Sequence, residues 1–293
     1  MAPVDILVRR AGIVKAVRAF FDALGFVEVE TDVRIAAPAP EEHIDCPEVT
    51  AFPQAGTPVT YLRASPELQM KKLLAAGMEK IYQIGPCFRE GERGSRHRSE
   101  FTMLEWYRKD ADYRDIMRDM AELLAHLTGK DVSELGYAEL GVREAYRRFA
   151  GWDPWEDWDG DRFDFDMATK IEPAIKEMGG IVFLKDYPVP AASLAKLGGE
   201  DAQGRFAERW ELYWDGMELA NCFSELCDER EQRFRFERAK AARKLLGEAD
   251  YPLDEDFFGC LPEIGRAAGV ALGIDRLVMM LTGAKEISAV RSV

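Results

Sequence analysis

The segment Cys87–Arg108, CFREGERGSRHRSEFTMLEWYR, consists of two apolar stretches joined by a charged loop that is punctuated by glycines. The apolar residues on either side predict a strand, a polar loop and a second strand. Between Arg89 and Glu100 lie four arginines, one histidine and three glutamates. Guanidinium groups are planar, permanently charged and able to bind phosphate oxygens in a bidentate way. The loop is therefore a candidate phosphate-binding segment, although a solvated hairpin tip of mixed charge has the same composition.

Composition and charge are those of a protein that can bury a large core. The sequence has 293 residues, of which 47% are hydrophobic and 31% charged, and its net charge is −14. This length suits one or two domains. Because proteins hold nucleic-acid backbones by neutralising phosphates with basic groups, the acidity makes tRNA an unlikely partner. It is compatible with a cationic substrate or a basic partner.

The five cysteines are scattered without a CxxC pair and only three histidines occur, so we expect neither a zinc site nor a disulfide framework. Unpaired cysteines suit a reducing compartment, and a cytoplasmic location is expected. The chain opens without a signal-peptide pattern, and no apolar run reaches the about 18 residues of a membrane helix. No membrane association is therefore expected.

The N-terminal part of the chain predicts a helix followed by a strand. Residues 4–24 place their apolar side chains on one helical stripe, and Gly25 follows as a stop signal. Residues 26–33 alternate valine or threonine with acidic side chains, which predicts a half-exposed strand.

A second helix start is predicted at Ser65, Pro66 and Glu67. Serine caps helices, proline fits the first turn, and glutamate faces the positive end of the helix dipole. We expect this helix to run to Gly77. Two further helices are predicted over residues 112–129 and from Asp228 to about Gly247.

Asp215 and Gly216 stand between two apolar runs, a pattern that favours a two-residue type I′ turn. Pairing across that turn sets Glu211 opposite Ala220. Paired residues and residues two apart share a face, so Glu211 and Glu218 lie on one face, roughly 7–8 Å apart at the backbone. Two such carboxylates can hold Mg²⁺ beside a triphosphate, and unpaired glutamates on a solvent face are the alternative.

Residues 269–283, GVALGIDRLVMMLTG, predict a strand of small residues, a bend and a helix that starts at Asp275. Arg276 would lie in the first turn of that helix. The helix dipole and the guanidinium both favour a phosphate there. A buried strand–helix unit without a ligand is the alternative.

Three of these segments resemble the signature motifs of class II aminoacyl-tRNA synthetases. Residues 4–33 resemble motif 1, the segment around Arg89 resembles motif 2, and residues 269–283 resemble motif 3. The likeness extends from Val4 to the end of the chain, and it is greatest to the lysyl branch and its short paralogue family, the elongation factor P lysine-lysyltransferases. An ordinary helix–strand unit remains the alternative for residues 4–33, because Asp32 stands where the family has proline.

The resemblance implies an α+β protein with the class II synthetase catalytic fold, a mainly antiparallel β-sheet flanked by helices. It implies a single catalytic domain over residues 1–293, without an N-terminal anticodon-binding OB barrel, and a homodimer built through motif 1.

The implied activity is the ATP-dependent activation of lysine or (R)-β-lysine as an aminoacyl-adenylate. The activated amino acid then passes to a lysine side chain of elongation factor P. ATP and Mg²⁺ are the implied cofactors. Three alternatives share part of this sequence pattern: a truncated enzyme that charges tRNA, an enzyme that uses another small amine acceptor, and a non-catalytic relative.

Motif resemblance also assigns nucleotide-binding roles to side chains. Arg89 would bind the α-phosphate and the substrate carboxylate, and Arg276 the γ-phosphate. Phe101 would stack on adenine, between the base and Arg276, and His97 would contact the outgoing phosphates. The family's glutamate for adenine is replaced by glycine here, and Glu92, which follows it, is the nearest substitute. Glu211 and Glu218 match the family's metal ligands.

The amino-acid pocket implied by the resemblance is lined by Ser65, Glu67, Glu218, Asn221, Glu225 and Ala271. Asn221 and Glu225 match residues that hold the substrate's amino groups. Strict alternation would put Asn221 on the opposite face from Glu218, so a bulge or bend is required. Cys222 stands where the family has glycine, and it is expected to narrow the pocket or to add a thiol beside it.

Overall fold

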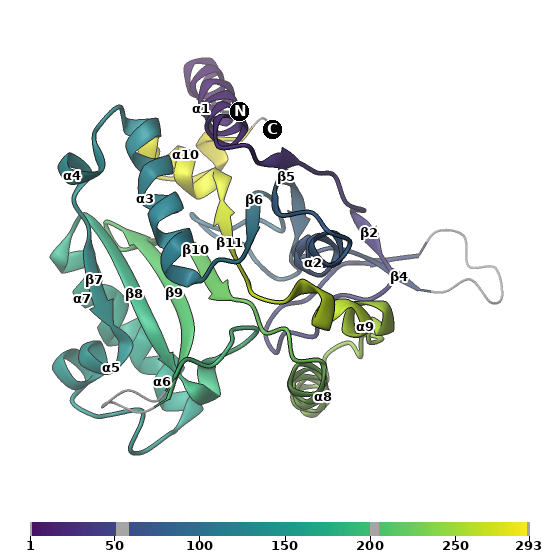
Figure 1. Cartoon of the computed structure of the whole chain (residues 1–293). Coiled ribbons are helices and arrows are strands. Elements are labelled where there is room, and N and C mark those ends of the chain that lie inside the picture. The colour runs from purple at the N-terminus through teal and green to yellow at the C-terminus, as the bar shows by residue number, and fades with distance from the viewer. Residues whose placement is uncertain (1, 51–58, 200–204, 292–293) are drawn as a thin grey trace. The chain divides into compact units, whose positions relative to one another are not determined.

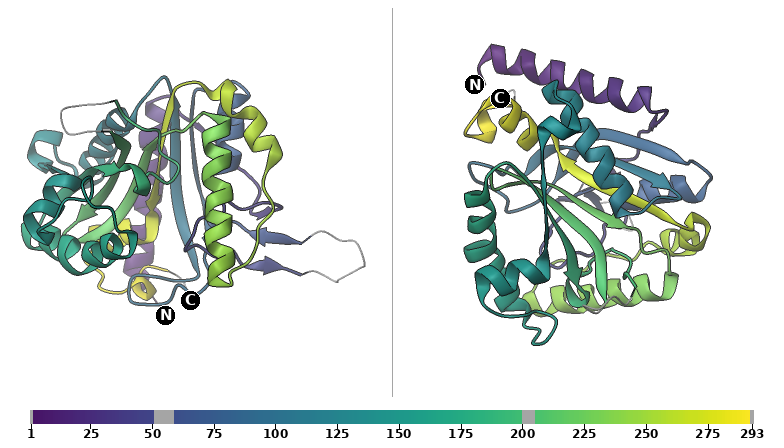
Figure 2. Two further views of the ribbon diagram at one scale, coloured as in Figure 1. Left: turned by 90° about the horizontal axis from the view of Figure 1, so that it is seen from below. Right: turned by 60° about the vertical axis from the view of Figure 1, so that its left-hand side comes forward.

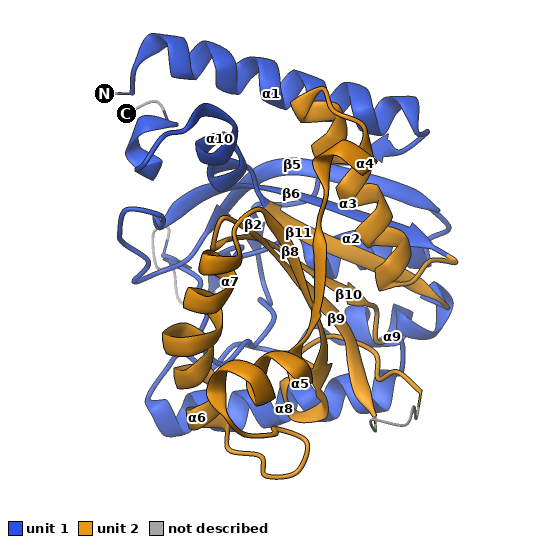
Figure 3. Cartoon of the chain, turned by 90° about the vertical axis from the view of Figure 1, so that its left-hand side faces the viewer, with its two compact units in different colours: residues 1–109, 227–265, 273–293 blue, residues 110–226, 266–272 orange. Residues whose placement is uncertain are grey.

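The computed structural model describes residues 2–50, 59–199 and 205–291. The described chain forms two compact units, shown in different colours in Figure 3. Unit 1 comprises residues 1–109, 227–265 and 273–293, and unit 2 comprises residues 110–226 and 266–272. Both units combine helices with sheets in which antiparallel pairs predominate, which confirms the predicted α+β class.

Unit 1 is built on the hairpin that the opening segment predicts. Strands β5 (Lys80–Phe88) and β6 (Glu100–Lys109) pair in an antiparallel way along their whole length, and β1 (Val27–Glu28) joins β5 in parallel. Both long strands are visible in Figure 2. A separate three-stranded sheet has the order β2–β4–β3, formed by β2 (Arg34–Ile35), β3 (Glu48–Val49) and β4 (Thr60–Leu62).

The predicted helices of unit 1 agree with the observed ones to within about two residues, and the structure adds a helix over residues 255–264 and a 3₁₀ turn over residues 287–289 that were not predicted. Asp228 caps one of them, because its carboxylate accepts a hydrogen bond from the N–H of Glu231, and Gly247 ends it in a left-handed conformation. These helices are α1 (Val4–Ala23), α2 (Glu67–Ala75), α8 (Glu229–Leu246), α9 (Glu255–Ile264), α10 (Ile274–Thr282) and the short 3₁₀ turn η4 (Ile287–Ala289).

The strand predicted over residues 26–33 is wrong in its extent, since only β1 forms there. The cause is the buried guanidinium of Arg63, which donates to the carbonyl oxygens of Thr31 at 2.9 Å and Asp32 at 3.2 Å. Backbone oxygens that a side chain already satisfies do not need a neighbouring strand. Asp32, the departure from the family pattern, therefore lies in an irregular segment.

Unit 2 contains a sheet with the order β11–β10–β9–β8–β7. Its strands are β7 (Ala138–Gly141), β8 (Ile181–Pro188), β9 (Phe206–Trp214), β10 (Met217–Ser224) and β11 (Ala267–Gly273), and β8 to β10 are labelled in Figure 1. Asp215 and Gly216 have φ values of 47° and 73°, which are the positive angles of a type I′ turn. The predicted hairpin between β9 and β10 is thus confirmed.

Helix α3 of unit 2 lies across β9 and β10 (Figure 2). The other side of unit 2 has a core in which Tyr146 stacks on Phe163 with ring centroids 4.6 Å apart. The helices are α3 (Tyr113–Thr128), α4 (Val132–Leu135), α5 (Val142–Ala145), α6 (Gly160–Asp166) and α7 (Glu172–Met178), with π-helical turns η1 (Tyr146–Ala150) and η2 (Met167–Ile171) and the 3₁₀ turn η3 (Val189–Ala191). No helix in the described parts of the chain combines the length and apolar character that crossing a membrane requires.

Candidate active site

In unit 1, Arg89 follows the last residue of β5 and lies against Phe101 of β6, with the guanidinium carbon 5.2 Å from the ring centroid. Its Nη1 is 3.5 Å from the carboxylate of Glu92. Its Nε is buried and has no hydrogen-bond partner among the described residues. A buried N–H without a partner costs free energy unless a ligand accepts from it, so this arginine suits an anionic ligand.

Arg276 lies in the first turn of α10, as predicted, and its Nη2 is 2.6 Å from Nε2 of His97. A guanidinium can only donate hydrogen bonds, so Nε2 of His97 must be an acceptor and the ring must be neutral. Burial and the positive charge of Arg276 both lower the pKa of His97, which agrees with a neutral ring. The structure thus brings His97 to Arg276 and Phe101 to Arg89.

Asp275, the neighbour of Arg276, is almost fully buried and fixes the start of α10. Its carboxylate accepts from the backbone N–H of Thr102 at 2.9 Å, from Arg291 at 3.1 Å, and from Arg10 of α1 in an ion pair of 2.5 Å. Three elements that are distant in sequence therefore meet at one carboxylate. This arrangement holds the helix that carries Arg276 against β6.

Ser65 connects the start of α2 to a buried carboxyl group. Its Oγ accepts from the N–H of Glu67 at 2.9 Å and donates to Oε1 of Glu105 at 2.7 Å. Tyr107 donates to the second oxygen of Glu105 at 2.8 Å. Burial, together with the negative charge of Glu67, raises the pKa of Glu105 to about 7. A carboxyl group poised between its two forms suits a cationic ligand, whose charge would favour ionisation.

Sequence reasoning missed Glu105 because it lies in the run FTMLEWYR, which was interpreted as an apolar strand. The signal was present, since a single acidic residue between Leu104 and Trp106 in a buried strand must be neutral, paired or functional.

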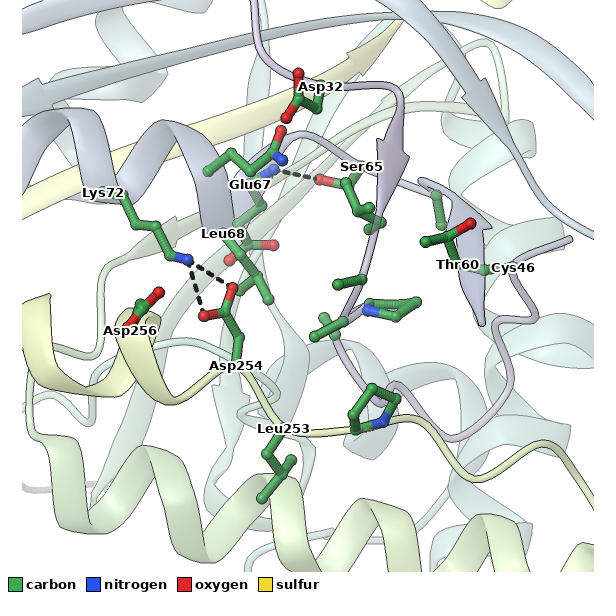
Figure 4. Close-up of a pocket in the computed structure, with 18 of the residues that line it drawn as sticks. Asp32, Cys46, Thr60, Ser65, Glu67, Leu68, Lys72, Leu253, Asp254 and Asp256 are labelled. Atoms are coloured by element: carbon green, nitrogen blue, oxygen red, sulfur yellow. Dashed lines mark hydrogen bonds and ion pairs between the residues drawn. The ribbon is translucent and has the colours of Figure 1, made fainter. Parts of the chain in front are cut away.

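A cavity of about 580 Å³ in unit 1 borders this cluster (Figure 4). Ser65 and Glu67 line one side, and the ion pair between Lys72 and Asp254, with a nitrogen–oxygen distance of 2.7 Å, lies at another. Glu67 is also tied to the buried ammonium of Lys71 at 2.5 Å. Two of the predicted pocket residues therefore face open space, and carboxylates outnumber cations along the walls.

In unit 2, a bulge sets the register of the β9–β10 hairpin. Pairing shifts between Glu218 and Ala220, so Glu211 lies opposite Asn221 and not opposite Ala220. The predicted pairing of Glu211 was wrong by one residue, because regular pairing was assumed beyond the turn. The bulge that Asn221 required is confirmed, and it places Asn221 on the face that carries Glu211.

Asn221 also lies directly opposite Ala271 of β11. Ala271, Asn221 and Glu211 thus form one row across three adjacent strands, and all three are partly exposed while their neighbours along the strands are buried. Glu218, three residues before Asn221, is partly exposed as well. The row provides an amide and a carboxylate beside a small side chain.

Arg209 is a member of this face that sequence reasoning missed. Its Nη2 forms an ion pair of 2.5 Å with Oε1 of Glu211, and its Nε donates to Oδ1 of Asn221 at 3.2 Å. The guanidinium lies 4.3 Å from the ring centroid of Tyr187. Tyr213 donates to the other oxygen of Glu211 at 2.8 Å. Only the pairing of β9 with β10 shows that an arginine reaches both predicted ligands.

The Cys222 thiol does not line this face. Cys222 is paired with Trp210, whose indole N–H donates to the carbonyl of Tyr113 in α3, so both side chains point to the α3 side. Burial, together with the negative charge of Glu225, raises the pKa of the Cys222 thiol well above its usual range. Glu225 is itself buried just beyond β10.

Glu211 and Glu218, the two carboxylates expected to bind Mg²⁺, lie on one face of the β9–β10 hairpin. Among the described residues, no group of three or more histidine, cysteine, aspartate or glutamate side chains is gathered as a metal site. Mg²⁺ keeps several waters and is commonly bound by one or two carboxylates together with substrate phosphates. Two carboxylates on one face are compatible with this use of Mg²⁺ and are too few for a structural zinc site.

Comparison with known proteins agrees with these features. The sequence model of a family described as tRNA synthetases class II (D, K and N) matches residues 4–292. A protein of Proteus mirabilis named elongation factor P–(R)-beta-lysine ligase is 37% identical, over 99% of this chain and 94% of that protein. Proteins of the same name from Photorhabdus laumondii and Yersinia enterocolitica are 38% and 37% identical over the same shares.

Proposed function

We propose, since this chain belongs to the class II tRNA synthetase family (D, K and N), that it is an ATP-dependent ligase that attaches a lysine isomer to elongation factor P. The observation that carries the proposal is the match along 99% of the chain to proteins named elongation factor P–(R)-beta-lysine ligase. The substrate is lysine or (R)-β-lysine, and the acceptor is a lysine side chain of the factor.

In the first step the substrate carboxylate attacks the α-phosphorus of ATP, the bond to the β-phosphate oxygen breaks, and pyrophosphate leaves. We assign Arg89 to the α-phosphate and the carboxylate, because its buried Nε needs an acceptor. Arg276, with neutral His97 beside it, is assigned to the leaving phosphates. Phe101 would stack on adenine and Glu92 would accept from its amino group. Such groups accelerate the reaction by position and charge.

Glu211 and Glu218 would hold Mg²⁺, which when bound neutralises phosphate oxygens. Glu211 can do so while it is paired with Arg209, since a carboxylate offers about four lone-pair sites.

Recognition of the amino acid is assigned to acidic and amide groups. Glu105 and Glu67 in unit 1, and Glu225 in unit 2, are carboxyl groups that suit an ammonium. Asn221 turns its oxygen toward Arg209, which leaves its amide N–H groups to donate. We therefore assign Asn221 to the substrate's carboxylate and not to its amino group. A neutral analogue would not supply the positive charge that these carboxyl groups favour.

In the second step the neutral ε-amine of the acceptor lysine attacks the adenylate carbonyl, an amide bond forms, and AMP leaves. We propose that the enzyme works as a homodimer through α1 and that it has little affinity for tRNA, given the net charge of −14.

The first step is tested by ATP–pyrophosphate exchange that depends on added lysine or (R)-β-lysine. Arg89→Ala and Arg276→Ala should each lose about 10²–10³-fold in exchange, the usual loss for one preorganised charge partner. Arg93→Ala, in the same loop but exposed, is the matched control and should stay close to wild type. Exchange at wild-type rates in both arginine variants would contradict the assignment.

A further inference from the structure

We propose that Arg209 is a positioning residue that fixes the side chains of Asn221 and Glu211 for the activation step. The role of Arg209 in activation rests on the proposed function, whereas its contacts are those seen within unit 2. Arg209 lies on β9 two residues before Glu211, and the β-bulge of β10 brings Asn221 within its reach.

The guanidinium of Arg209 donates hydrogen bonds to three different acceptors. Nη2 binds Glu211 at 2.5 Å, Nε binds Asn221 at 3.2 Å, and Nη1 binds the carbonyl of Ala191 at 2.9 Å. The guanidinium lies over the ring of Tyr187, and its side chain is 15% exposed. A rigid planar group held on one face and hydrogen-bonded along its edges can rotate little, so the acceptors it binds are fixed as well.

These contacts determine the orientation of the Asn221 amide. An amide presents an oxygen at one end and an NH₂ group at the other, and only the oxygen can accept from a guanidinium. Turning the amide by 180° would set its N–H groups against those of Arg209. Asn221 is therefore held with its donors on the face that it shares with Glu211 and Ala271.

The substitution Arg209→Lys keeps the positive charge but loses the planar guanidinium group with its several N–H donors. An ammonium at the end of a flexible chain can approach Glu211, but it cannot hold Asn221 and Glu211 at fixed positions at the same time. The substitution Arg209→Gln loses the positive charge as well, and it leaves a single NH₂ group as donor. The series from arginine to lysine to glutamine should therefore release Asn221 progressively.

The chain offers a direct probe of this release, because Asn221 is the only asparagine among its 293 residues. Protein labelled with ¹⁵N-asparagine gives one pair of side-chain amide signals. In Arg209→Gln this pair should move toward the positions of a free asparagine amide, with Arg209→Lys in between. The matched control is Arg143→Gln in the same unit, because Arg143 is 17% exposed, pairs with Asp153 at 2.8 Å and lies over Trp155. The control should leave the Asn221 signals unchanged.

Amino-acid-dependent pyrophosphate exchange gives the second readout. Arg209→Gln should raise KM for the amino acid by about tenfold or more, the loss of one hydrogen bond to a charged group, with partial rescue in Arg209→Lys. Arg143→Gln should lower the thermal stability of the protein about as much as Arg209→Gln does, but it should leave KM for the amino acid unchanged.

Wild-type Asn221 signals together with a wild-type KM in Arg209→Gln would overturn the proposal, and Arg209 would then be a structural ion pair only. Should Arg209→Gln not fold, the same two measurements on Arg209→Lys decide, and unshifted signals in that variant count against the proposal. If the wild-type protein shows no exchange with either lysine isomer, the proposed function fails, while the amide signals still decide the role of Arg209.

Discussion

Glu105 is a carboxyl group whose ionisation is coupled to folding. Burial, together with the negative charge of Glu67, raises its pKa from 4.5 to about 7. Between these two values the folded protein keeps a proton that the unfolded chain has lost. The contribution of Glu105 to the free energy of unfolding is therefore complete below pH 4.5, falls as pH rises toward 7, and is constant above it.

Glu105→Gln removes this dependence, since glutamine is neutral at every pH. The free energy of unfolding of the variant, relative to that of wild type, should be higher at pH 8 than at pH 5 by about 2.5 kcal/mol, so the variant gains stability relative to wild type as pH rises. Urea unfolding at the two pH values measures the difference. The exposed Glu79→Gln should show no comparable change. If the free energies of unfolding of Glu105→Gln and wild type differ by the same amount at both pH values, Glu105 is ionised in the folded protein and its pKa is not raised.

Ala271 is the small side chain in the row with Asn221 and Glu211, and it lies directly opposite Asn221 on the neighbouring strand. The ammonium groups of α-lysine and β-lysine differ in position by one carbon, so the methyl group of Ala271 can penalise one isomer and not the other. Ala271→Gly should improve the use of α-lysine relative to β-lysine by about tenfold, within the usual range for one methylene of pocket volume.

The measurement for Ala271→Gly is kcat/KM for both isomers in pyrophosphate exchange. Ala268→Gly is the control, because it removes the same methyl from the same strand but three residues away, on the opposite face. An unchanged ratio between the isomers in Ala271→Gly would show that this alanine serves only for packing.

At the scale of elements, the β9–β10 hairpin depends on its turn. Gly216 has a φ of 73°, and a Cβ at this position would overlap the side chain of Lys176 in α7. Gly216→Ala should therefore destabilise unit 2 by about 1–2 kcal/mol or more, from the cost of a left-handed conformation in a residue with a Cβ. Urea unfolding checks this. Gly141→Ala, with a negative φ and open space around it, is the control and should cost much less.

The β9–β10 hairpin also shows which structural features could be predicted from the sequence and which could not. The turn type follows from two residues, and the need for a bulge follows from the period of a strand, so both were predictable. The position of the bulge was not, because it depends on which side chains the neighbouring strands accept. Arg209 was missed for a related reason, because its role comes from contacts across strands and local periodicity carries no information about such contacts. Glu105 was missed although the sequence marks it as a single acidic residue in an apolar strand.

The short β1 strand gives a second example at this scale. Alternating residues over 26–33 predict a strand, but the buried Arg63 takes over the backbone oxygens of that segment. A long-range hydrogen bond from a buried cation thus overrides local alternation. Helices α1, α2, α3, α8 and α10, by contrast, were located from their stripes and caps, because those signals are local. The short helices α4 to α7 and helix α9 were not predicted.

At the scale of the whole molecule, assembly is the first question. Val4 and Val8 lie one helical turn apart on α1 and are 74% and 66% exposed. Apolar side chains on a segment that resembles motif 1 suit a subunit interface. Wild type should sediment as a dimer at micromolar concentration, and Val8→Glu should shift the protein toward monomer. A monomeric wild type would contradict the proposed homodimer.

The identity of the acceptor is the central claim, and intact-mass spectrometry tests it most directly. The protein would be incubated with ATP, Mg²⁺, (R)-β-lysine, elongation factor P and bulk tRNA, with Arg276→Ala as the inactive control. The account predicts that elongation factor P gains the mass of one lysyl group, that substitution of its acceptor lysine abolishes the gain, and that tRNA stays uncharged. Stable aminoacylation of tRNA with an unmodified elongation factor P would contradict it.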